Sequence, residues 1–445
     1  MINKPDKENS IKYISESART GQVFKGLVLH LHPVKVKRAT LKFNHTFGLG
    51  GMIVLLFLMQ VLTGILLRFY YNPSPAKAYD SILHIQNQVV FGQFVRNIHH
   101  WGGILIVLLS FLHLMRVFYT GAFHPPRRSN WIIGVTLLIL LIFSNFTGYL
   151  LPWDQISYWA VTVSTSILGY VPGIGKWLEE MMRGGTHLGP ETLINFYNFH
   201  TSIFPMTIII LMAFHFWKIR KAGGVVVPGG ISNPDKSLVP SDPNLIGREL
   251  VVALVLLAVL FTMSVFLNAP LHDRANPVFS PNPVKAPWYF VGIQELLLHF
   301  HPFVGGIFIP VLFVAGLIYF PFIKYEEKRT GVWFYSEKGK KIATWSALLA
   351  LLITSLLILA NEKFIHFDQW LPGLPEIISN GFIPLLVILL SLAFYLFILK
   401  RKAGASRLEL LIALFTVLVF SYLVMSITAI WFRGPGMSLV WPLKV

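Results

Sequence analysis

Residues 96–116 read RNIHHWGGILIVLLSFLHLMR, an apolar run that contains His99 and His113. About 20 apolar residues at roughly 1.5 Å per residue cross the roughly 30 Å of hydrocarbon in a membrane, so this run is long enough to span one. An imidazole buried in hydrocarbon costs free energy unless it has a partner or a function. The run therefore predicts a membrane helix whose two histidines each have a binding partner or a function.

The composition of the whole chain is that of a membrane protein. Of the 445 residues, 54% are hydrophobic and only 13% are charged, and the mean hydropathy is +0.63. This excludes an ordinary soluble domain of the same length. We expect an all-α polytopic fold with nine transmembrane helices, near residues 47–69, 100–120, 131–151, 201–219, 248–268, 305–323, 343–361, 381–399 and 408–431.

The net charge of +17 is unevenly distributed along the chain. If the N-terminus is cytoplasmic, residues 1–46, 116–130, 218–248, 324–342 and 400–407 lie on the inner side, and they hold 27 of the 37 Lys and Arg residues. This asymmetry follows the positive-inside rule and accounts for much of the charge without a nucleic-acid partner. We expect a prokaryotic cytoplasmic membrane, with the N-terminus on the cytoplasmic side.

The chain contains no cysteine. Disulfides, iron–sulfur ligation and thioether attachment of haem are therefore excluded within it, and a metal ion must be held by His, Met or oxygen ligands. Residues 1–42 have no signal-like apolar core, so we expect them to be retained. Residues 15–38 are expected to form a short basic amphipathic helix on the inner membrane surface.

Composition divides the chain into five segments. They are an interfacial segment (1–46), a four-helix domain (47–221), a Gly- and Pro-rich linker (222–246), the first helices of a C-terminal domain (247–325) and additional transmembrane helices (326–445). The long outer loop 152–199 is expected to contribute short surface helices.

Four histidines follow one pattern. His99 and His113 lie 14 residues apart on the second span, and His200 and His215 lie 15 apart on the fourth. At about 100° per residue these spacings return the side chains to within roughly 40° and 60° of one direction, and they separate them by roughly 21 to 23 Å. Both spans run inward, so two histidine pairs are expected, one near each membrane face. Such pairs suit two bis-histidine haems. Each histidine alone has the simpler interpretation of a core residue bonded to a backbone carbonyl.

Glycines on the first and third spans share this period. Gly50 and Gly64, and likewise Gly134 and Gly148, lie 14 residues apart. Only glycine lets a helix backbone approach a macrocycle closely, although small residues in membrane helices also serve ordinary helix packing. The shared period favours a cofactor-binding role.

Two arginines flank the second span. Arg96 lies one turn before His99, and Arg116 lies one turn after His113. They are expected to neutralise haem propionates; ordinary interfacial snorkelling is the alternative.

From about residue 40 to 325 the sequence resembles cytochrome b of the quinol-oxidising Rieske/cytochrome b complexes. Its N-terminal half is most similar to the split photosynthetic form, here fused to a C-terminal half similar to that form's subunit IV. The motifs, in order, are LGGMIVLLFLMQVLTG (49–64), RNIHHWGG (96–103), FLHLMRVFYTGAFHPPR (111–127), GYLLPWDQISYWAV (148–161), GGTHLGPETLINFYNFHT (184–201) and HFWKIRKAG (215–223).

The resemblance implies two non-covalent b-type haems, an outer one on His99 and His200 and an inner one on His113 and His215. It also implies a Rieske iron–sulfur protein and a c-type cytochrome subunit as partners, a dimeric complex in the lipid bilayer, and proton translocation. Gly48 stands where the photosynthetic form has a cysteine that binds an extra haem. No covalent haem is therefore expected here, while a non-covalent extra haem stays open.

The resemblance places a quinol site near the outer face. The family's Pro-Glu-Trp-Tyr motif corresponds to Ala286-Pro287-Trp288-Tyr289, which lacks the glutamate credited with taking a proton from quinol. Glu295 is the nearest carboxylate, and the alternatives are that it replaces this glutamate or that it only forms a salt bridge or a helix cap. The implied outer-site residues are Tyr149, Pro152, Trp153, Trp288, Tyr289 and Glu295.

An inner quinone site is implied near Asn44, His45, Lys218 and Arg220. Two other functions stay open. One is a diheme quinone-reactive subunit that passes both electrons to one partner. The other is a transporter or structural subunit whose histidines line a proton or substrate path.

Overall fold

The computed structural model describes residues 34–229, 238–326, 329–365 and 367–441. Within them, nine helices are long and apolar enough to cross a membrane, which confirms the predicted all-α polytopic fold. These spans are α3 (Leu49–Arg68), α5 (Gly92–Tyr119), α6 (Arg128–Leu150), α9, η3 and α10 (Pro190–Asn198, Phe199–Ile203, Phe204–Lys221), α12 (Ile246–Phe266), η4, α14 and η5 (Val304–Phe308, Ile309–Tyr319, Phe320–Phe322), α15 (Glu337–Lys363), η6 and α17 (Ile378–Phe382, Ile383–Lys402) and α18 (Arg407–Trp431).

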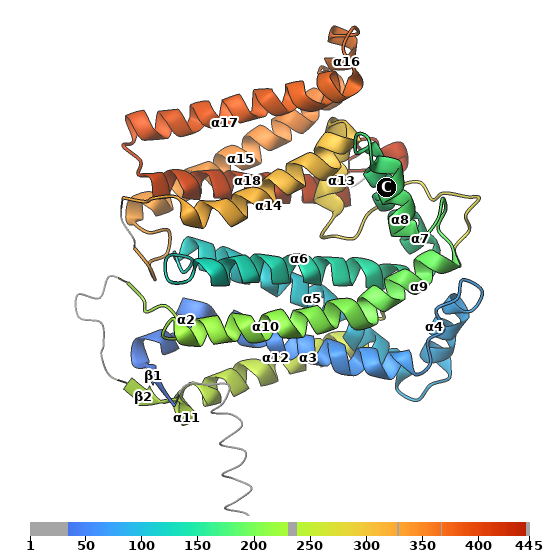
Figure 1. The fold of residues 1–445 in the computed structure, drawn as a ribbon, viewed down its shortest axis with the longest axis horizontal. Coiled ribbons are helices and arrows are strands. Elements are labelled where there is room, and N and C mark those ends of the chain that lie inside the picture. The colour runs from blue at the N-terminus through green and yellow to red at the C-terminus, as the bar shows by residue number, and fades with distance from the viewer. Residues whose placement is uncertain (1–33, 230–237, 327–328, 366, 442–445) are drawn as a thin grey trace, which may run out of the picture.

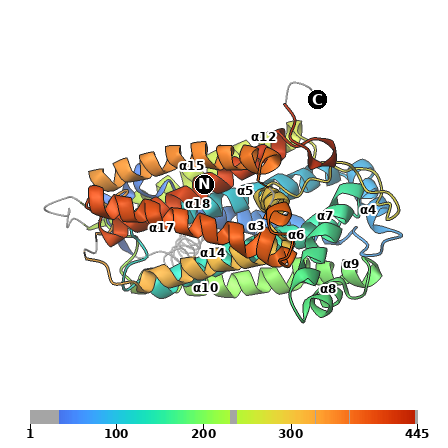
Figure 2. The same ribbon diagram turned by 90° about the horizontal axis from the view of Figure 1, so that it is seen from above.

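Short helices gather at the two ends of these spans. The loop 152–199 contains α7 (Gln155–Ser166), η2 (Ile167–Tyr170) and α8 (Gly175–Arg183), as expected, and α4 (Ala78–Asn87) lies at the same end (Figure 2), which we call the outer end after the expected topology. The remaining short elements are β1 (Lys35–Lys37), η1 (Arg38–Leu41), α2 (Phe43–Thr46), β2 (Leu238–Pro240), α11 (Ser241–Asn244), α13 (Val291–His299), α16 (Phe367–Trp370) and η7 (Pro435–Met437).

The four N-terminal spans α3, α5, α6 and α10 form a bundle (Figure 1). The next two spans lie on opposite sides of it, because α12 packs against α5 and α3 while α14 packs against α6. The segment 267–290 that joins these two helices therefore passes over the outer end of the bundle. This places the motif at 286–289 beside the end of the bundle that holds His99 and His200.

The last span, α18, belongs to the main hydrophobic core. The ring of Phe415 stacks on Phe118 of α5 with ring centroids 3.9 Å apart, and both side chains are buried. Leu408 and Ile412 join the same cluster, as does Trp131 of α6. The C-terminal spans are thus joined to the N-terminal bundle through continuous packing.

A capping box fixes the start of α18. Ser406 Oγ accepts a hydrogen bond from the Glu409 backbone N–H, and Glu409 Oε2 accepts one from the Ser406 backbone N–H. Ser336 Oγ donates to Glu409 Oε1 at 2.9 Å, so the same glutamate ties the beginning of α15 to that of α18.

The predicted amphipathic helix at 15–38 is wrong at its C-terminal end. Residues 35–37 form β1, which pairs antiparallel with β2, and a 3-10 turn begins at Arg38. The β-branched Val36 between two lysines suits a strand, and the end of the linker supplies the partner. Residues 15–33 lie outside the described residues.

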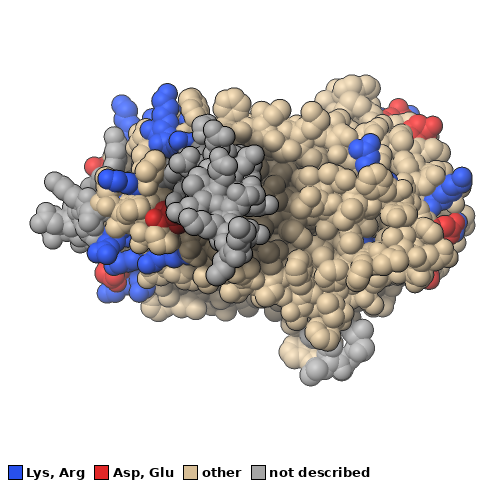
Figure 3. Space-filling model, turned by 90° about the horizontal axis from the view of Figure 1, so that it is seen from below, with Lys and Arg blue, Asp and Glu red and all other residues tan. Residues whose placement is uncertain are grey.

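Charge is segregated along the length of the molecule. Figure 3 shows more Lys and Arg side chains at the end that carries β1 and β2 than at the opposite end, some acidic side chains at both ends, and a band between them that is almost free of charge. Together with the nine spans, this band identifies an integral membrane protein.

Candidate functional site

The two outer histidines face each other inside the bundle. The ring centroids of His99 on α5 and His200 on η3 are 5.9 Å apart, and the rings are nearly perpendicular. Two imidazoles on opposite sides of one metal ion, each with a bond of roughly 2 Å, keep their centroids about 6 Å apart. The separation therefore fits a shared metal ion.

Each of the four periodic glycines lies against one of the four histidines. A methyl group on Gly64 would lie 3.3 Å from His99 Cε1, and one on Gly148 would overlap the His200 ring. The inner glycines repeat this pairing at longer range: the corresponding distance is 3.8 Å from Gly50 to His113 and 3.5 Å from Gly134 to His215. Gly64 and Gly148 thus make room for the imidazoles of the facing helices, whereas the distances at Gly50 and Gly134 are ordinary contacts.

A π turn accounts for the 15-residue spacing on the fourth span. The Phe204 backbone N–H bonds to the Phe199 carbonyl, five residues back, within η3. Such a turn accommodates one residue more than an α-helical turn, so His200 and His215 lie in register with Gly148 and Gly134, which are only 14 apart. Pro205 follows directly; its ring would clash with a carbonyl four residues back in a regular helix, and a wider turn avoids this.

Hydrogen bonds define the tautomers of both outer histidines. His200 Nδ1 lies 2.8 Å from the Ser144 carbonyl, which only accepts, so Nδ1 carries the proton. Thr63 Oγ1 donates to the Met59 carbonyl at 2.6 Å and therefore accepts from His99 Nδ1 at 2.9 Å. In both rings Nε2 is left with its lone pair, which is the state a metal ligand needs.

The inner pair has a buried cation beside it. His113 and His215 are electrostatic neighbours, and the His215 ring interacts with the backbone of Asn130, one turn before Gly134 on α6. Arg116 is 7% exposed; its Nε donates to the His45 carbonyl at 2.9 Å, while its Nη2 is unpaired in the described part of the chain. An unpaired buried donor of this kind fits an anionic group of a ligand.

Arg96 differs from Arg116. Its Nη1 and Nη2 donate to the carbonyls of Ala269 and Pro270 at 2.8 and 2.6 Å, and it too is 7% exposed. Arg96 therefore anchors the segment that crosses the outer end of the bundle, and it has fewer donors left for a ligand.

Comparison with known proteins identifies the N-terminal half. A family model described as Cytochrome b/b6/petB matches residues 34–223. Cytochrome b6 of Heliomicrobium gestii is 46% identical over 180 residues, which make up 40% of this chain and 84% of that protein. The chain belongs to the cytochrome b/b6 family. Cytochrome b6 of Porphyra purpurea is 43% identical over the same shares of both chains, and membership of the family implies b-type haem, which the histidine and glycine geometry fits.

The whole cytochrome b chain also has a structural counterpart. A chain of a structure titled Hyperthermophilic respiratory Complex III superposes with a TM-score of 0.66 over 94% of this chain and 98% of that one, at 24% sequence identity. At this identity the match concerns the fold. It extends over the C-terminal spans, which the cytochrome b6 relatives do not cover.

The outer-site residues predicted from the motifs come from three segments. Trp153, at the turn after α6, has a left-handed backbone with φ of 52°, and its carbonyl accepts from the Ala275 N–H in the crossing segment. Tyr149 lies close to Tyr289. Burial, followed by the proximity of Tyr149, raises the pKa of Tyr289, so its hydroxyl stays protonated. Pro152 lies in the same turn as Trp153.

Trp288 supplies an unpaired donor. Its indole Nε1 is buried and has no hydrogen-bond partner among the residues that the structure describes. The side chain packs, together with Tyr289, against the cluster that includes Ile98 of α5 and Leu256 of α12. A donor in this position suits an acceptor such as a carbonyl oxygen of a ligand.

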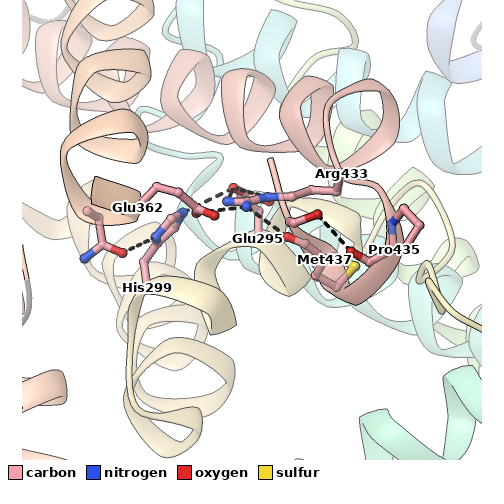
Figure 4. A network of polar contacts seen from close by, with 8 residues as sticks. Glu295, His299, Glu362, Arg433, Pro435 and Met437 are labelled. Carbon is pink, nitrogen blue, oxygen red and sulfur yellow. Dashed lines mark hydrogen bonds and ion pairs between the residues drawn. The ribbon is translucent and has the colours of Figure 1, made fainter. Parts of the chain in front are cut away.

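Glu295 is fully buried on α13 and already has partners (Figure 4). Arg433 Nη2 lies 2.7 Å from its Oε1, and Arg433 Nε lies 3.0 Å from its Oε2; His299 Nε2 lies 3.2 Å from Oε1. Burial alone raises the pKa of Glu295, but the hydrogen bonds from His299 and Arg433 outweigh it and hold the pKa below its usual value. Of the two alternatives left open by the sequence, the structure displays the salt bridge.

Four residues were predicted to form an inner quinone site, and two of them, His45 and Lys218, contact other groups of the protein. His45 is buried, and its Nε2 donates to the Val226 carbonyl at 2.6 Å, while burial lowers its pKa. Lys218 Nζ lies 5.3 Å from the centre of the Trp217 ring. Asn44 precedes His45 in α2, and Arg220 lies near the end of α10.

The sequence reasoning missed Thr63, Ser144 and Arg433. Thr63 carried a weak signal, since it is the residue before Gly64 and four residues after the carbonyl that it binds. Ser144 acts through its backbone, and Arg433 lies 138 residues from its partner, so neither left a local pattern.

Proposed function

We propose that this chain is the cytochrome b subunit of a quinol-oxidising, proton-translocating membrane complex, carrying electrons between the two membrane faces. The proposal is supported by one observation above all: His99 faces His200, His113 lies near His215, and each of these four histidines has a glycine against its ring. His99 and His200 hold the outer b-type haem, and His113 and His215 hold the inner one, without covalent attachment.

A haem with two imidazole ligands has no open coordination position, so it supplies one-electron transfer. The protein's contribution is orientation. Thr63 and the Ser144 carbonyl fix the outer rings with Nε2 free, Gly64 and Gly148 give these rings room, and Gly50 and Gly134 lie in contact with the inner rings. The spacing of 14 residues on α5 sets the two sites roughly 21 Å apart along the helix.

The outer quinol site is formed by Tyr149, Pro152, Trp153, Trp288 and Tyr289. The protonated Tyr289 hydroxyl and the unpaired Trp288 N–H are the donors that orient a quinol oxygen. Since Glu295 is buried and doubly hydrogen-bonded by Arg433, we do not assign it the proton-accepting role. The group that accepts the quinol proton is therefore one other than Glu295.

A second quinone site lies near the inner ends of α3 and α10, with Asn44, Lys218 and Arg220 as contacts and His45 as a structural support. The unpaired Nη2 of Arg116 at this end suits a propionate of the inner haem. Protons are taken up on this side and released at the outer side.

The proposed partners are a Rieske iron–sulfur protein and a c-type cytochrome subunit, in a dimeric complex. The location is a prokaryotic cytoplasmic membrane with the N-terminus on the cytoplasmic side, an orientation supported by the basic end of the molecule in Figure 3. We propose the five-part division of the chain at residues 46, 221, 246 and 325 as its functional organisation.

Absorbance and redox titration of the purified complex test the haem assignment. Two b-type components are expected, and His113→Ala should remove only one of them. His84→Ala is the matched control, because His84 lies on the short outer helix α4, where its Nδ1 lies 2.8 Å from Gln88 Oε1. Absence of b-type haem in the wild-type protein would overturn the proposal in favour of a transporter or structural subunit.

Single-turnover quinol oxidation tests the route of the two electrons. We expect one electron on a Rieske centre and one on a b haem. Reduction of both b haems with none of the Rieske centre would instead support a non-bifurcating diheme quinone-reactive subunit, which the altered Ala286-Pro287 motif makes a specific alternative.

A further inference from the structure

The chain after α18 folds into a small hairpin at the outer end. The Gly434 N–H bonds to the Ser438 carbonyl, and the Val440 N–H bonds to the Phe432 carbonyl. Arg433 lies at the base of this hairpin, pairs with Leu439 across it and is 3% exposed. We call residues 432–440 the C-terminal clasp.

The clasp and the end of α18 contact the segment around the quinol motif at successive points. The Gly436 N–H donates to Asn282 Oδ1, and Lys285 Nζ donates to the Ile430 carbonyl at 2.7 Å. Further along, Tyr422 of α18 donates its hydroxyl to the Tyr289 carbonyl at 2.7 Å. The backbone of the motif is thus held from outside the four-helix bundle.

The fourth contact is a buried ion pair. The guanidinium of Arg433 donates hydrogen bonds to both carboxylate oxygens of Glu295. Its Nη1 donates to Glu362 Oε2 and to the Met437 carbonyl at 2.9 and 3.0 Å (Figure 4). A bidentate arginine–carboxylate pair fixes the relative orientation of the two side chains in addition to neutralising their charges. Because both side chains are buried, each charge offsets the desolvation cost of burying the other.

Glu295 lies on the face of α13 that packs on α18. Gly292, one turn earlier on the same face, is so close to Tyr422 and Ser426 of α18 that a methyl group there would lie 2.6 and 2.7 Å from them. Trp288 and Tyr289, immediately before α13, pack on the bundle side. Movement of α13 against α18 would therefore displace both aromatic residues from the bundle.

We propose that Arg433 is a positioning residue for outer quinol oxidation, which it supports by fixing α13 through Glu295 and so holding Trp288 and Tyr289 against the bundle. This inference rests on the proposed function. It gives the last span and the clasp a role in the outer site.

Steady-state quinol oxidation by the intact complex tests the proposal with three variants. Arg433→Gln is expected to raise KM for quinol and to lower kcat/KM roughly tenfold, since small misplacement of a binding group has effects of this size or larger. Arg433→Lys keeps the positive charge but cannot form the bidentate hydrogen bonds of a guanidinium. Its KM and kcat/KM should therefore lie between those of Arg433→Gln and the wild type. Arg407→Gln is the matched control, because Arg407 forms an exposed ion pair at the opposite end of α18.

A double variant deals with failure to fold. Arg433→Gln leaves the Glu295 charge buried and unpaired, which destabilises proteins strongly, so a failure of this variant to assemble would follow from that charge alone. Glu295→Gln/Arg433→Gln removes both charges. We expect the double variant to assemble with both b haems, to show faster hydrogen exchange in residues 282–299 and to keep a raised KM.

Two outcomes would overturn the inference while leaving the proposed function intact. One is a wild-type KM and kcat in Arg433→Gln. The other is a wild-type KM and unchanged hydrogen exchange in the double variant. Failure of the proposed function is distinguishable from both, because the wild-type complex itself would then lack haem or quinol oxidation.

Discussion

Gly148 of α6 and His200 of η3 lie so close that a single methyl group at position 148 would overlap the imidazole ring. This contact is the tightest of the four glycine–histidine contacts. The His200 ring is held in place by the hydrogen bond from its Nδ1 to the carbonyl of Ser144, which lies on α6 one turn before Gly148. The outer site therefore tolerates less change at its glycine than the inner site does.

Gly148→Ala is expected to displace His200 and to destabilise the protein by about 1–3 kcal/mol, as overpacking of a filled core does. Gly50→Ala serves as the control, because its methyl group would lie 3.8 Å from His113 Cε1, an ordinary contact. The haem-to-protein ratio and the b-type absorbance check both variants. Equal haem loss in the two would contradict the asymmetry.

Thr63→Val is expected to weaken haem retention at the outer site. It keeps the shape of the side chain but leaves the His99 Nδ1–H without its acceptor, and loss of such a supporting bond typically costs 10–100-fold in metal affinity. Thr136→Val is the matched control, since the Thr136 hydroxyl donates to the carbonyl of Ile132 on its own helix. Redox titration should show one altered component, and a change in both would argue against the assignment.

The spans were predictable from apolar length, and the common interval of the glycines and histidines was recognisable because it is periodic. The contact of each glycine with one imidazole was not predicted, since the glycines were expected to lie against a macrocycle. The interval of 15 was harder to interpret, since a π turn at 199–203 absorbs the extra residue. Its signal in the sequence is Pro205, and the two other π turns in the described part of the chain likewise precede Pro310 and Pro384.

The environment of Glu295 was not predictable in the same way. Its carboxylate depends on an arginine 138 residues later in the chain, beyond a region that resembles no cytochrome b6 motif. No local spacing encodes such a pairing, so the sequence left both roles of Glu295 open. The strand at 35–37 was missed for a similar reason, because its partner at 238–240 follows four intervening spans.

Stability should fall in acid because of the Glu295–Arg433 pair. The pKa of Glu295 lies below its ordinary value of 4.5 in the folded protein, so the pair contributes stability above pH 4.5 and this contribution is lost as the pH falls further, through the folded pKa. Glu295→Gln/Arg433→Gln should flatten this dependence. Thermal unfolding measured between pH 3 and 7 checks it, with a difference in Tm of roughly 2–4 °C per kcal/mol expected; parallel curves for variant and wild type would contradict the role of the pair.

Arg116→Gln is expected to lower the midpoint potential of the inner haem and leave the outer one unchanged. The variant removes a buried cation whose Nη2 has no partner among the described residues, and a nearby positive charge favours the reduced state of an iron centre. Loss of about 1 kcal/mol of this interaction corresponds to roughly 40 mV for one electron. Arg401→Gln is the control, because Arg401 is exposed at the same end of the molecule and lies over the Phe397 ring. A shift of equal size in the control would mean that general surface charge, rather than the placement of Arg116, sets the potential.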